Sequence, residues 1–415
     1  MFELLLRNVS QPEVPVAPRV EIVQVGGKYE LRRDGQPYFI KGAGCSNSND
    51  EMLQRLSAAG GNSIRTWGAD NAGELLDRAQ RHGISVTLGY WLGHVAHGFK
   101  WDDPKMLAEQ EQKIRDTVAK HKDHPSLLMW ALGNEMEINN DNDQLWTEVG
   151  RLAKIVKSID PNHPVTTVIA DCNKEKAERI KRLAPDVDIL GVNSYGGLAT
   201  LPTRLREYGW TKPFMVTEYG PLGQWEVPKN AFGMTQEQTS TEKAKRYREM
   251  HEQKILGNPG WCLGGYAFIW GNKQEETATW FGMHLPTGEN LQAVDEMTRL
   301  WSGRYPANRS PQIRSVRVSP KNDVAKGAEI EFVVDAFDPD RDALHYEYVL
   351  RHESTDKKIG GYPEKAPPTV FTRDAGDSSR LRFRMPEYPG EYRIFVYIRD
   401  GKGNAATANV SLRAQ

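Results

Sequence analysis

The stretch "NSIRTWGADNAGELLDRAQRHGISVTLGYW" (residues 62–91) decides the fold. It opens with a short β-rich run and continues with a segment whose apolar residues recur at three- and four-residue spacing. It closes with a second short β-rich run. Gly83, at the end of the helical segment, fits the position that follows a helix. The order strand, helix, strand predicts a βαβ unit with parallel strands.

The same alternation recurs from about residue 20 to residue 305. The short runs are nearly continuous in apolar character, as expected of strands buried on both faces. Eight strands, each followed by a helix, predict a (β/α)8 TIM barrel. An open doubly wound sheet is the alternative, but no GxGxxG sequence follows the first run. The eight runs are "YFIKGAG" (38–44), "NSIRTWG" (62–68), "SVTLGYW" (85–91), "LLMWALGNE" (127–135), "PVTTVIA" (164–170), "VDILGVNSY" (187–195), "PFMVTEYG" (213–220) and "GGYAFIW" (264–270).

Three regions follow from these patterns. Residues 1–37 form an N-terminal extension whose "DGQP" turn predicts a β-hairpin at the bottom of the barrel, and residues 38–305 form the α/β barrel. After the break "GRYPANRSPQ" (303–312), alternating strands alone predict an all-β immunoglobulin- or fibronectin-like sandwich over residues 312–415. The sandwich runs are "IRSVRVSP", "AEIEFVVDAFD", "LHYEYVLRH", "SRLRFRMP", "GEYRIFVYIRD" and "ATANVSLRA".

Composition excludes several classes of protein. The 415 residues carry a net charge of −1 and no dense basic run, which argues against nucleic acid as a partner. No apolar run reaches the roughly 18–20 residues of a membrane helix. The three cysteines are widely spaced, so we expect buried thiols and no zinc site or disulfide framework. The oligomeric state is left open.

The first residues, "MFELLLRNVSQPEVPVAPRV", have a short apolar patch without a basic region before it. We expect a secreted or periplasmic protein whose signal peptide was removed, with the cytoplasm as the alternative.

Two carboxylates end strands on opposite sides of the predicted barrel. Glu135 closes the fourth run and Glu218 lies in the seventh. Active sites of such barrels lie at the carboxyl ends of the strands. Cleavage of a glycosidic bond requires one protonated and one ionised carboxyl group across a cleft. A single carboxylate at a strand end is ordinarily a solvated loop residue. The prediction of a catalytic pair therefore depends on both carboxylates lying at the same end of the barrel.

Other functional side chains fall at the same strand ends or in the loops after them. We predict that they bind substrate: Arg65, Trp67, Trp91, His94, Asn134, Tyr195, Trp225, Trp270 and Trp280. Arg65 and the Tyr195 hydroxyl would keep Glu218 ionised, whereas an apolar surround would keep Glu135 protonated. Structural packing is the alternative for Trp225 and Trp280. A structural loop role is the alternative for His94, and also for His284, a further candidate for contacting a sugar hydroxyl.

"WALGNE" (130–135) followed by "VTEYG" (216–220) resembles the retaining glycoside hydrolases of clan A. The resemblance covers the whole barrel and implies that Glu135 is the general acid/base and Glu218 the nucleophile. It also implies that Asn134 binds the sugar 2-hydroxyl, that Tyr195 and Arg65 hold Glu218, and that Trp270 forms the floor of the −1 subsite. Glu137, two residues beyond Glu135, is expected to be a loop or subsite residue.

Within the clan, the strand runs around "YFIKGAG" and residues 62–91 resemble the barrels of family 2 and of the family 72 β-1,3-glucan transglycosylases. A barrel followed by one immunoglobulin-like domain resembles the family 158 endo-β-1,3-glucanases. These resemblances imply hydrolysis of a β-linked glycan, with a β-1,3-glucan favoured, and no cofactor or metal in the reaction. A transglycosylase and a non-catalytic glycan-binding protein are the alternatives.

"DPDRDALHYEY" (338–348) resembles the loop-and-strand stretch of PKD-like and cadherin-like modules. Asp338, Asp340 and Asp342 are candidate Ca²⁺ ligands. A solvated turn rich in Asp and Pro is the alternative.

Overall fold

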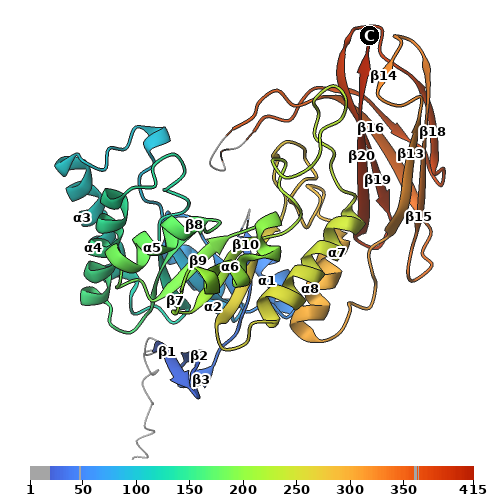
Figure 1. Cartoon of the computed structure of the whole chain (residues 1–415). Helices are drawn as coiled ribbons and strands as arrows, with labels where there is room; N and C mark the ends of the chain where they lie inside the picture. Colours follow the sequence, from blue (N-terminus) through green and yellow to red (C-terminus); the bar gives the residue numbers. More distant parts are fainter. Residues whose placement is uncertain (1–18, 46–47, 359–361, 363) are drawn as a thin grey trace, which may run out of the picture.

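The structure, a computed structural model, describes residues 19–45, 48–358, 362 and 364–415. The first 18 residues of the predicted N-terminal extension lie outside these residues. The chain folds into a barrel, a small sheet below it and a two-sheet unit beside it (Figure 1).

Eight parallel strands close into the predicted barrel, in the order in which they follow one another along the chain. Each predicted run supplies one strand, and the TIM-barrel prediction is confirmed. The strands are β4 (Ile40–Cys45), β5 (Ser63–Arg65), β6 (Ser85–Tyr90), β7 (Leu127–Leu132), β8 (Val165–Ala170), β9 (Ile189–Asn193), β10 (Phe214–Tyr219) and β11 (Cys262–Trp270).

The helices around the barrel begin and end where the local sequence allows. Asn49 caps the first helix by accepting a hydrogen bond from the Met52 amide, and Thr239 and Glu242 form a capping box at the seventh. Gly60 and Gly83 follow two of the helices at φ of +86° and +67°, which favours glycine. The helices are α1 (Asp50–Ala58), α2 (Ala72–Arg81), α3 (Pro104–His121), α4 (Asp143–Ile159), α5 (Lys174–Leu183), α6 (Leu201–Glu207), α7 (Ser240–Met250) and α8 (Gln292–Ser302), with short turns η1 (Val95–His97), η2 (Gly196–Ala199) and η3 (His251–Leu256).

A small antiparallel sheet lies under the barrel, made of β1 (Val20–Val25), β2 (Lys28–Arg33) and β3 (Gln36–Pro37). Asp34 and Gly35 form the turn between its second and third strands, both at positive φ. Val20 and Leu31 of this sheet pack with apolar side chains from the first half of the barrel strands, Met129 among them. The sheet therefore seals the end of the barrel opposite to the carboxyl ends of its strands (Figure 1).

The C-terminal unit has two antiparallel sheets around its own core. One sheet contains β13 (Gln312–Ser319), β15 (Glu329–Phe337) and β18 (Arg380–Arg384). The other contains β16 (His345–His352), β17 (Thr369–Asp374), β19 (Gly390–Arg399) and β20 (Asn404–Ala414), with the short β14 (Asp323–Val324). Residues alternate between buried and exposed along β18, and the two sheets enclose one apolar core, which confirms the predicted all-β sandwich.

The barrel contributes a strand to the sandwich. The two residues of β12 (Asn290–Leu291), which precede α8, pair in parallel with Asn404 and Ala405 of β20. A small apolar cluster that includes Leu285 and Phe395 covers this joint. The buried Arg393 side chain donates a hydrogen bond to the Thr235 carbonyl at 3.0 Å. Main-chain pairing, apolar packing and polar contacts thus all join the two units.

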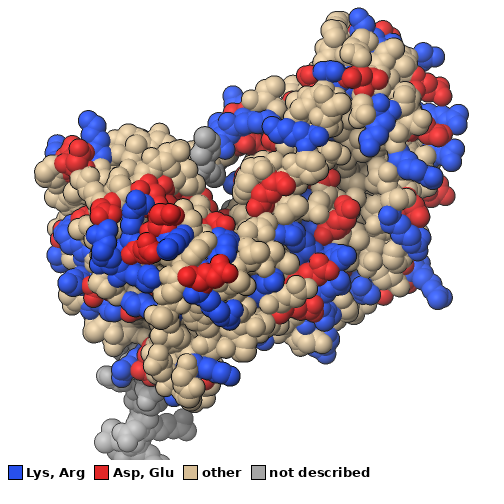
Figure 2. Space-filling view, in the orientation of Figure 1, with Lys and Arg blue, Asp and Glu red and all other residues tan. Residues whose placement is uncertain are grey.

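Charges are mixed over the surface. Figure 2 shows Lys and Arg side chains interleaved with Asp and Glu on the face drawn, as the net charge of −1 suggests. No described helix has the length and apolar content that crossing a bilayer would require.

Candidate active site

A cavity of about 1040 Å³ opens at the carboxyl ends of the barrel strands. Both predicted catalytic carboxylates line it, Glu135 after β7 and Glu218 within β10. A volume at the upper end of the usual range for ligand pockets has room for more than one sugar unit. This cavity is called the cleft below.

Glu218 is held by three hydrogen-bond donors. Arg65 Nη1 and Trp67 Nε1 each lie 2.8 Å from its Oε1, and the Tyr195 hydroxyl lies 2.8 Å from its Oε2. The side chain of Glu218 is 9% exposed and that of Arg65 is 1% exposed. Donors and a buried guanidinium stabilise the charged carboxylate. The predicted Arg65 and Tyr195 contacts with Glu218 are present.

Glu135 has a different environment. Gly133 and Glu135 take φ of +75° and +54°, so the chain turns sharply where β7 ends and presents the carboxyl group to the cleft. Asn193 Nδ2 donates a hydrogen bond to this carboxyl group, to Oε1 at 2.8 Å. Burial raises the pKa of Glu135 to about 8, and the charge of Glu218 acts in the same direction. The protonated form of Glu135 therefore prevails at neutral pH.

One chain of hydrogen bonds connects the two carboxyl groups. Asn193 Nδ2 also donates to Asn134 Oδ1 at 3.0 Å, and Arg65 Nη2 donates to the same oxygen at 2.5 Å. The Asn134 carbonyl is thus engaged by two donors, which leaves its amide hydrogens for a ligand in the cleft.

Five predicted binding residues line the cleft. Trp67 and Trp91 follow β5 and β6, Asn134 follows β7, Tyr195 follows β9, and Trp225 lies in the loop after β10. The Trp225 ring is 62% exposed and meets Tyr195 edge to face at 5.6 Å. An exposed indole at the wall of a cleft is suited to stacking on a sugar ring.

Two predicted binding residues are excluded from the cleft. Trp270 is fully buried, donates to the Met52 carbonyl at 3.1 Å and packs on Trp301 of α8. The pairing register of β11 with β4 shifts between Phe268 and Trp270, so Phe268 faces the cleft instead. Trp280 is 1% exposed and donates to the Leu222 carbonyl at 2.9 Å. The expectation of Trp270 as floor of the subsite is wrong, and Trp280 packs under the loop.

Arg65 and His94 lie behind the wall of the cleft. Arg65 acts through Glu218 and Asn134, and His94 stacks on Trp91 with ring centroids 4.7 Å apart. Burial lowers the pKa of His94, so the imidazole is neutral and packs as an aromatic. His284 is also buried and accepts a hydrogen bond from the Gly271 amide. Neither histidine lines the cleft.

Glu137 points away from the cleft into a buried ion pair. Lys176 Nζ lies 2.7 Å from Glu137 Oε1, which also accepts from the Ala170 amide at 2.8 Å. The two side chains are 10% and 1% exposed, for Lys176 and Glu137 respectively. Glu137 therefore holds the end of β8 and is not a subsite residue.

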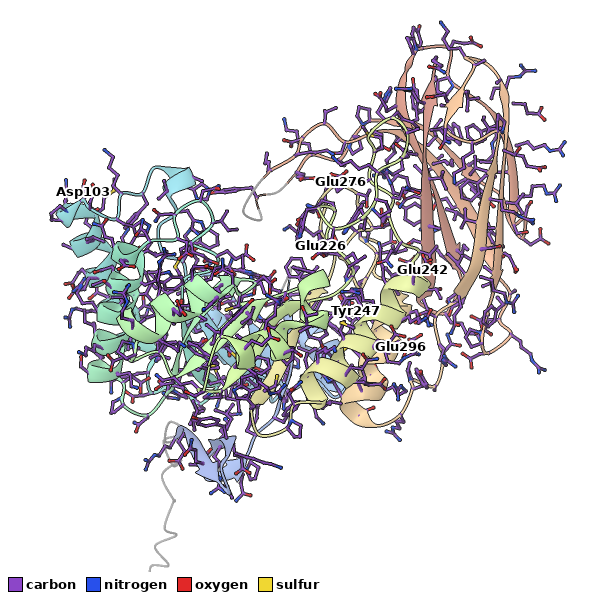
Figure 3. All side chains as sticks on the ribbon, in the orientation of Figure 1. Asp103, Glu226, Glu242, Tyr247, Glu276 and Glu296 are labelled. Atoms are coloured by element: carbon purple, nitrogen blue, oxygen red, sulfur yellow. The ribbon has the colours of Figure 1, made fainter. Side chains whose placement is uncertain are left out.

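Several residues that line the cleft were not among the predicted site residues. Asn193 ends β9 and was visible from the strand pattern, whereas Asp171, Glu226, Phe268, Lys273 and Glu275 carry no local motif. Figure 3 places Glu226 and Glu276 on the loops between the barrel and the sandwich. Glu226 accepts hydrogen bonds from the Gly196 and Gly223 amides and so fixes two loops to each other.

The sandwich contributes to the cleft. In Figure 1 the connection from β16 to β17 extends from the sandwich across the barrel, and its described residues Lys358, Tyr362 and Glu364 line the cleft. The Tyr362 hydroxyl lies 3.3 Å from His97 Nδ1, and the two rings meet edge to face. Glu364 accepts a hydrogen bond from the Glu276 amide at 2.7 Å, which anchors the connection to the barrel loop.

A closed barrel with two differently held carboxyl groups at the ends of its fourth and seventh strands defines the class of barrel glycoside hydrolases. The model of the TIM barrel domain of glycosyl hydrolases family 2 matches residues 44–251, half of the chain. The chain therefore belongs to glycosyl hydrolases family 2. The match supports the predicted family 2 likeness and adds nothing for families 72 and 158.

The chain is similar to curated proteins over part of its length. It is 25% identical over 272 residues to a β-glucuronidase of Paenibacillus borealis, covering 56% of this chain and 44% of that one. It is 28% identical over 224 residues to a β-glucuronidase of Streptococcus agalactiae, covering 46% and 37%. A β-galactosidase of Bacteroides ovatus is 25% identical over 205 residues, covering 41% and 23%. The chain thus spans less than half the length of these relatives.

Solved structures share the fold. A β-glucuronidase of Bifidobacterium dentium superposes with a TM-score of 0.55 at 19% identity, over 70% of this chain and 50% of that one. The β-glucuronidase 2 of Bacteroides uniformis superposes with a TM-score of 0.53 at 14% identity, over 95% and 48%. At these identities the likeness concerns the fold alone.

Proposed function

We propose that the chain is a retaining β-glycosidase that works by double displacement. In the first step a carboxylate oxygen of Glu218 attacks the anomeric carbon and forms a glycosyl ester. The bond from that carbon to the leaving oxygen breaks, and Glu135 transfers its proton to this oxygen. In the second step water attacks the anomeric carbon, Glu135 takes a proton from the water, and the bond to Glu218 breaks. Two inversions retain the configuration.

The contrast between the two carboxyl groups is the observation that carries the proposal. Glu218 accepts from three donors, one of them a buried guanidinium, and is suited to be the nucleophile. Glu135 has a pKa raised to about 8 and is suited to donate a proton near neutral pH. Two neighbouring carboxyl groups with opposite protonation states are the requirement of this reaction.

Asn134 supports the same assignment. Its carbonyl oxygen is occupied by Arg65 and Asn193, so its amide group is oriented toward the cleft. We infer that this amide donates to the sugar 2-hydroxyl, beside the carbon where the bond breaks. A hydrogen bond of this kind strengthens in the transition state.

The charges around the cleft favour a neutral sugar. Besides the catalytic pair, four acidic side chains line it, Asp171, Glu226, Glu275 and Glu364, against the two lysines Lys273 and Lys358. Lys273 Nζ already lies 2.5 Å from Glu275 Oε2, and Lys358 Nζ lies 3.5 Å from Asp356 Oδ2. A sugar carboxylate needs a cation that is not yet neutralised. We infer that a neutral β-glycoside is the substrate.

The names of the relatives suggest two candidate substrates. One curated relative is a β-galactosidase, which makes a β-galactoside the first neutral substrate to test. Two are β-glucuronidases, which makes the glucuronide the direct competitor. A β-1,3-glucan also belongs to the neutral class, but the comparisons give it no support.

A panel of aryl β-glycosides tests the proposal. The galactoside, glucoside and glucuronide are compared at equal concentration, together with laminarin, and the first-formed anomer is followed by proton NMR. We expect hydrolysis with a β-anomer as first product and the highest kcat/KM on a neutral sugar. Fast glucuronide cleavage would overturn the substrate class alone, and an α-anomer would overturn the mechanism. Products longer than the input would identify a transglycosylase, and binding without turnover a glycan-binding protein.

A further inference from the structure

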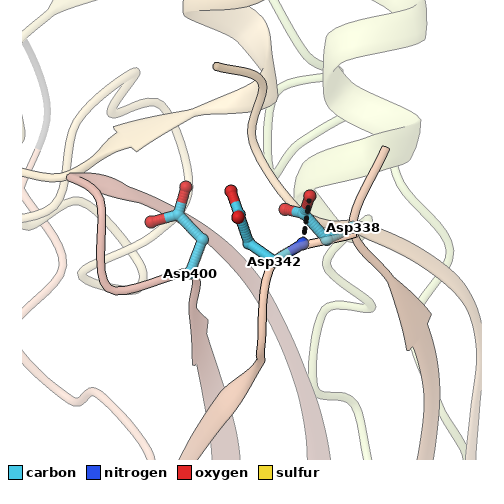
Figure 4. A group of neighbouring side chains, drawn as sticks. All are labelled: Asp338, Asp342 and Asp400. Carbon is cyan, nitrogen blue, oxygen red and sulfur yellow. Dashed lines mark hydrogen bonds between the residues drawn. The ribbon is translucent and has the colours of Figure 1, made fainter. Parts of the chain in front are cut away.

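Three aspartates of the sandwich meet at one point. Asp338 follows β15, Asp342 lies four residues later in the loop to β16, and Asp400 follows β19. Each offers a carboxylate oxygen, and these oxygens all lie within 4.8 Å of one another (Figure 4). Of the three aspartates considered from the sequence, Asp340 is not part of the group. Its Oδ2 accepts a hydrogen bond from the Arg309 amide at 2.7 Å instead.

Asp338 and Asp400 are buried and Asp342 is partly buried, and two oxygens of the group have no partner among the described residues. Asp338 is 8% exposed and Asp400 is 5% exposed. Asp338 Oδ1 accepts from the Asp340 and Asp342 amides, whereas Asp338 Oδ2 and Asp342 Oδ2 have no hydrogen bond among the described residues. Figure 4 shows the free oxygen of Asp338 directed toward the Asp342 carboxylate. Buried polar atoms are nearly always paired, so two orphaned anionic oxygens in one cluster point to a ligand.

The neighbouring donors do not balance the charge. Asp400 accepts from the Lys402 and Asn404 amides and from the side chains of Asn308 and Asn404, all of them neutral groups. Within the described part of the chain, one ammonium group is paired with the cluster, Lys402 Nζ at 2.5 Å from Asp342 Oδ1. The Lys402 side chain is 58% exposed and can leave without breaking any packing. Three carboxylates thus face one positive charge, carried by an exposed side chain.

We propose that Asp338, Asp342 and Asp400 bind one Ca²⁺ ion. Calcium binds oxygen ligands at about 2.3–2.6 Å, so two ligands of one ion lie at most about 5 Å apart, as these oxygens do. Water and main-chain carbonyls complete its coordination. Calcium also tolerates irregular geometry, whereas Mg²⁺ demands a tighter octahedron. Lys402 moves away from Asp342 when the ion binds.

The position gives the ion a structural role. Asn308 and Arg309 belong to the segment between α8 and β13, and they contact Asp400 and Asp340. The loop after β15, the turn after β19 and the segment that joins barrel to sandwich therefore converge on the site. None of the three aspartates lines the cleft. The ion would stabilise the joint without taking part in the reaction.

Calcium titration of the full chain, after treatment with EDTA, tests the site. Isothermal calorimetry should show one Ca²⁺ per chain, and Ca²⁺ should raise Tm more than Mg²⁺ does at equal concentration. Asp338→Asn and Asp342→Asn should weaken Ca²⁺ binding by at least tenfold and abolish the rise in Tm. Without calcium their Tm should equal or exceed that of the wild type, because one of three like charges is gone.

Two further variants make the test specific. Asp340→Asn removes the same charge from the same loop, and it should keep the full calcium-dependent rise in Tm. Lys402→Met removes the competing ammonium group and should tighten Ca²⁺ binding severalfold. The proposal is overturned if the wild type shows neither heat of binding nor a rise in Tm, or if Asp340→Asn loses the rise while Asp338→Asn keeps it.

Discussion

Arg65 Nη1 lies 2.8 Å from Glu218 Oε1 inside the barrel, and the same guanidinium donates to Asn134 through Nη2. One buried cation therefore orients both the proposed nucleophile and the residue beside the proposed acid. Arg65→Lys keeps the charge but not the planar pair of donors. We expect kcat/KM to fall by about 10²-fold, or about 2.7 kcal/mol of transition-state stabilisation, with KM little changed. Steady-state kinetics on the best aryl glycoside measure this, and unchanged kcat would contradict it.

Glu135→Gln should remove the proton donor but not the nucleophile. Because a good leaving group needs no proton, the first step should be little affected with a dinitrophenyl glycoside, and the loss in kcat/KM should be small. For an alkyl glycoside it should reach about 10²–10⁴-fold. The comparison of the two substrates is the measurement, and Glu137→Gln in the same loop is the control. Equal losses on both substrates would remove Glu135 from the role of acid.

The pH profile follows from the raised pKa of Glu135. The reaction needs the protonated form, so this group supports activity below its pKa and loses activity as the pH rises through about 8. We expect the alkaline limb of kcat/KM to fall near that pH and to disappear in Glu135→Gln when a dinitrophenyl glycoside is used. If the alkaline limb of kcat/KM in the wild type fell near pH 5 instead, the assignment of Glu135 as the acid would be contradicted.

Glu137 and Lys176 should matter for stability and not for chemistry. Lys176→Met leaves the Glu137 carboxylate buried without its cation, at a cost of about 3–5 kcal/mol in the free energy of unfolding. Adding Glu137→Gln removes the orphaned charge and keeps an acceptor for the Ala170 amide. The double variant should therefore recover much of the lost free energy of unfolding. Urea unfolding of the single and double variants measures this. Additive losses would show that the pair is not coupled.

The two tryptophans Trp225 and Trp280 should behave in opposite ways. Trp225 is exposed at the cleft, so Trp225→Ala should raise KM several-fold with little change in Tm. Trp280 is buried, so Trp280→Ala should cost about 3–5 kcal/mol of stability. Thermal unfolding and KM, measured on both variants, separate binding from packing. A lowered Tm with unchanged KM in Trp225→Ala would reverse its assignment.

Most of the fold was accessible from the sequence because buried parallel strands are continuous apolar runs, and each of the eight runs forms a barrel strand. β17 was missed because it follows Pro367 and Pro368 and is mostly exposed, so it shows no apolar alternation. The two-residue β12 and β14 are too short for any periodicity. Their pairing with β20 depends on contacts that are distant in the chain.

Some residues of the site could be predicted from the sequence and others could not. Glu135, Asn134 and Glu218 follow from strand order, because the carboxyl ends of all barrel strands meet at one face. Trp270 was misplaced because the register shift after Phe268 reverses which side chains face inward. Tyr362 could not be found, since it comes from another domain and reaches the cleft through a long connection. Asp400 could not be grouped with Asp338 from the sequence either, because the two residues lie in different loops of the sandwich.

Covalent trapping is the most direct test of the central claim that Glu218 is the nucleophile. The reagent is a 2-deoxy-2-fluoro glycosyl fluoride of the sugar that the substrate panel selects. Its fluorine at C2 slows both steps, and its fluoride leaving group speeds the first step alone. The glycosyl-enzyme therefore accumulates. Peptide mass spectrometry then locates the sugar. We expect one sugar per chain on Glu218, with Glu218→Gln unlabelled and Glu135→Gln still labelled. A sugar attached to Glu135, or to another residue while Glu218 stays free, would show that Glu218 is not the nucleophile.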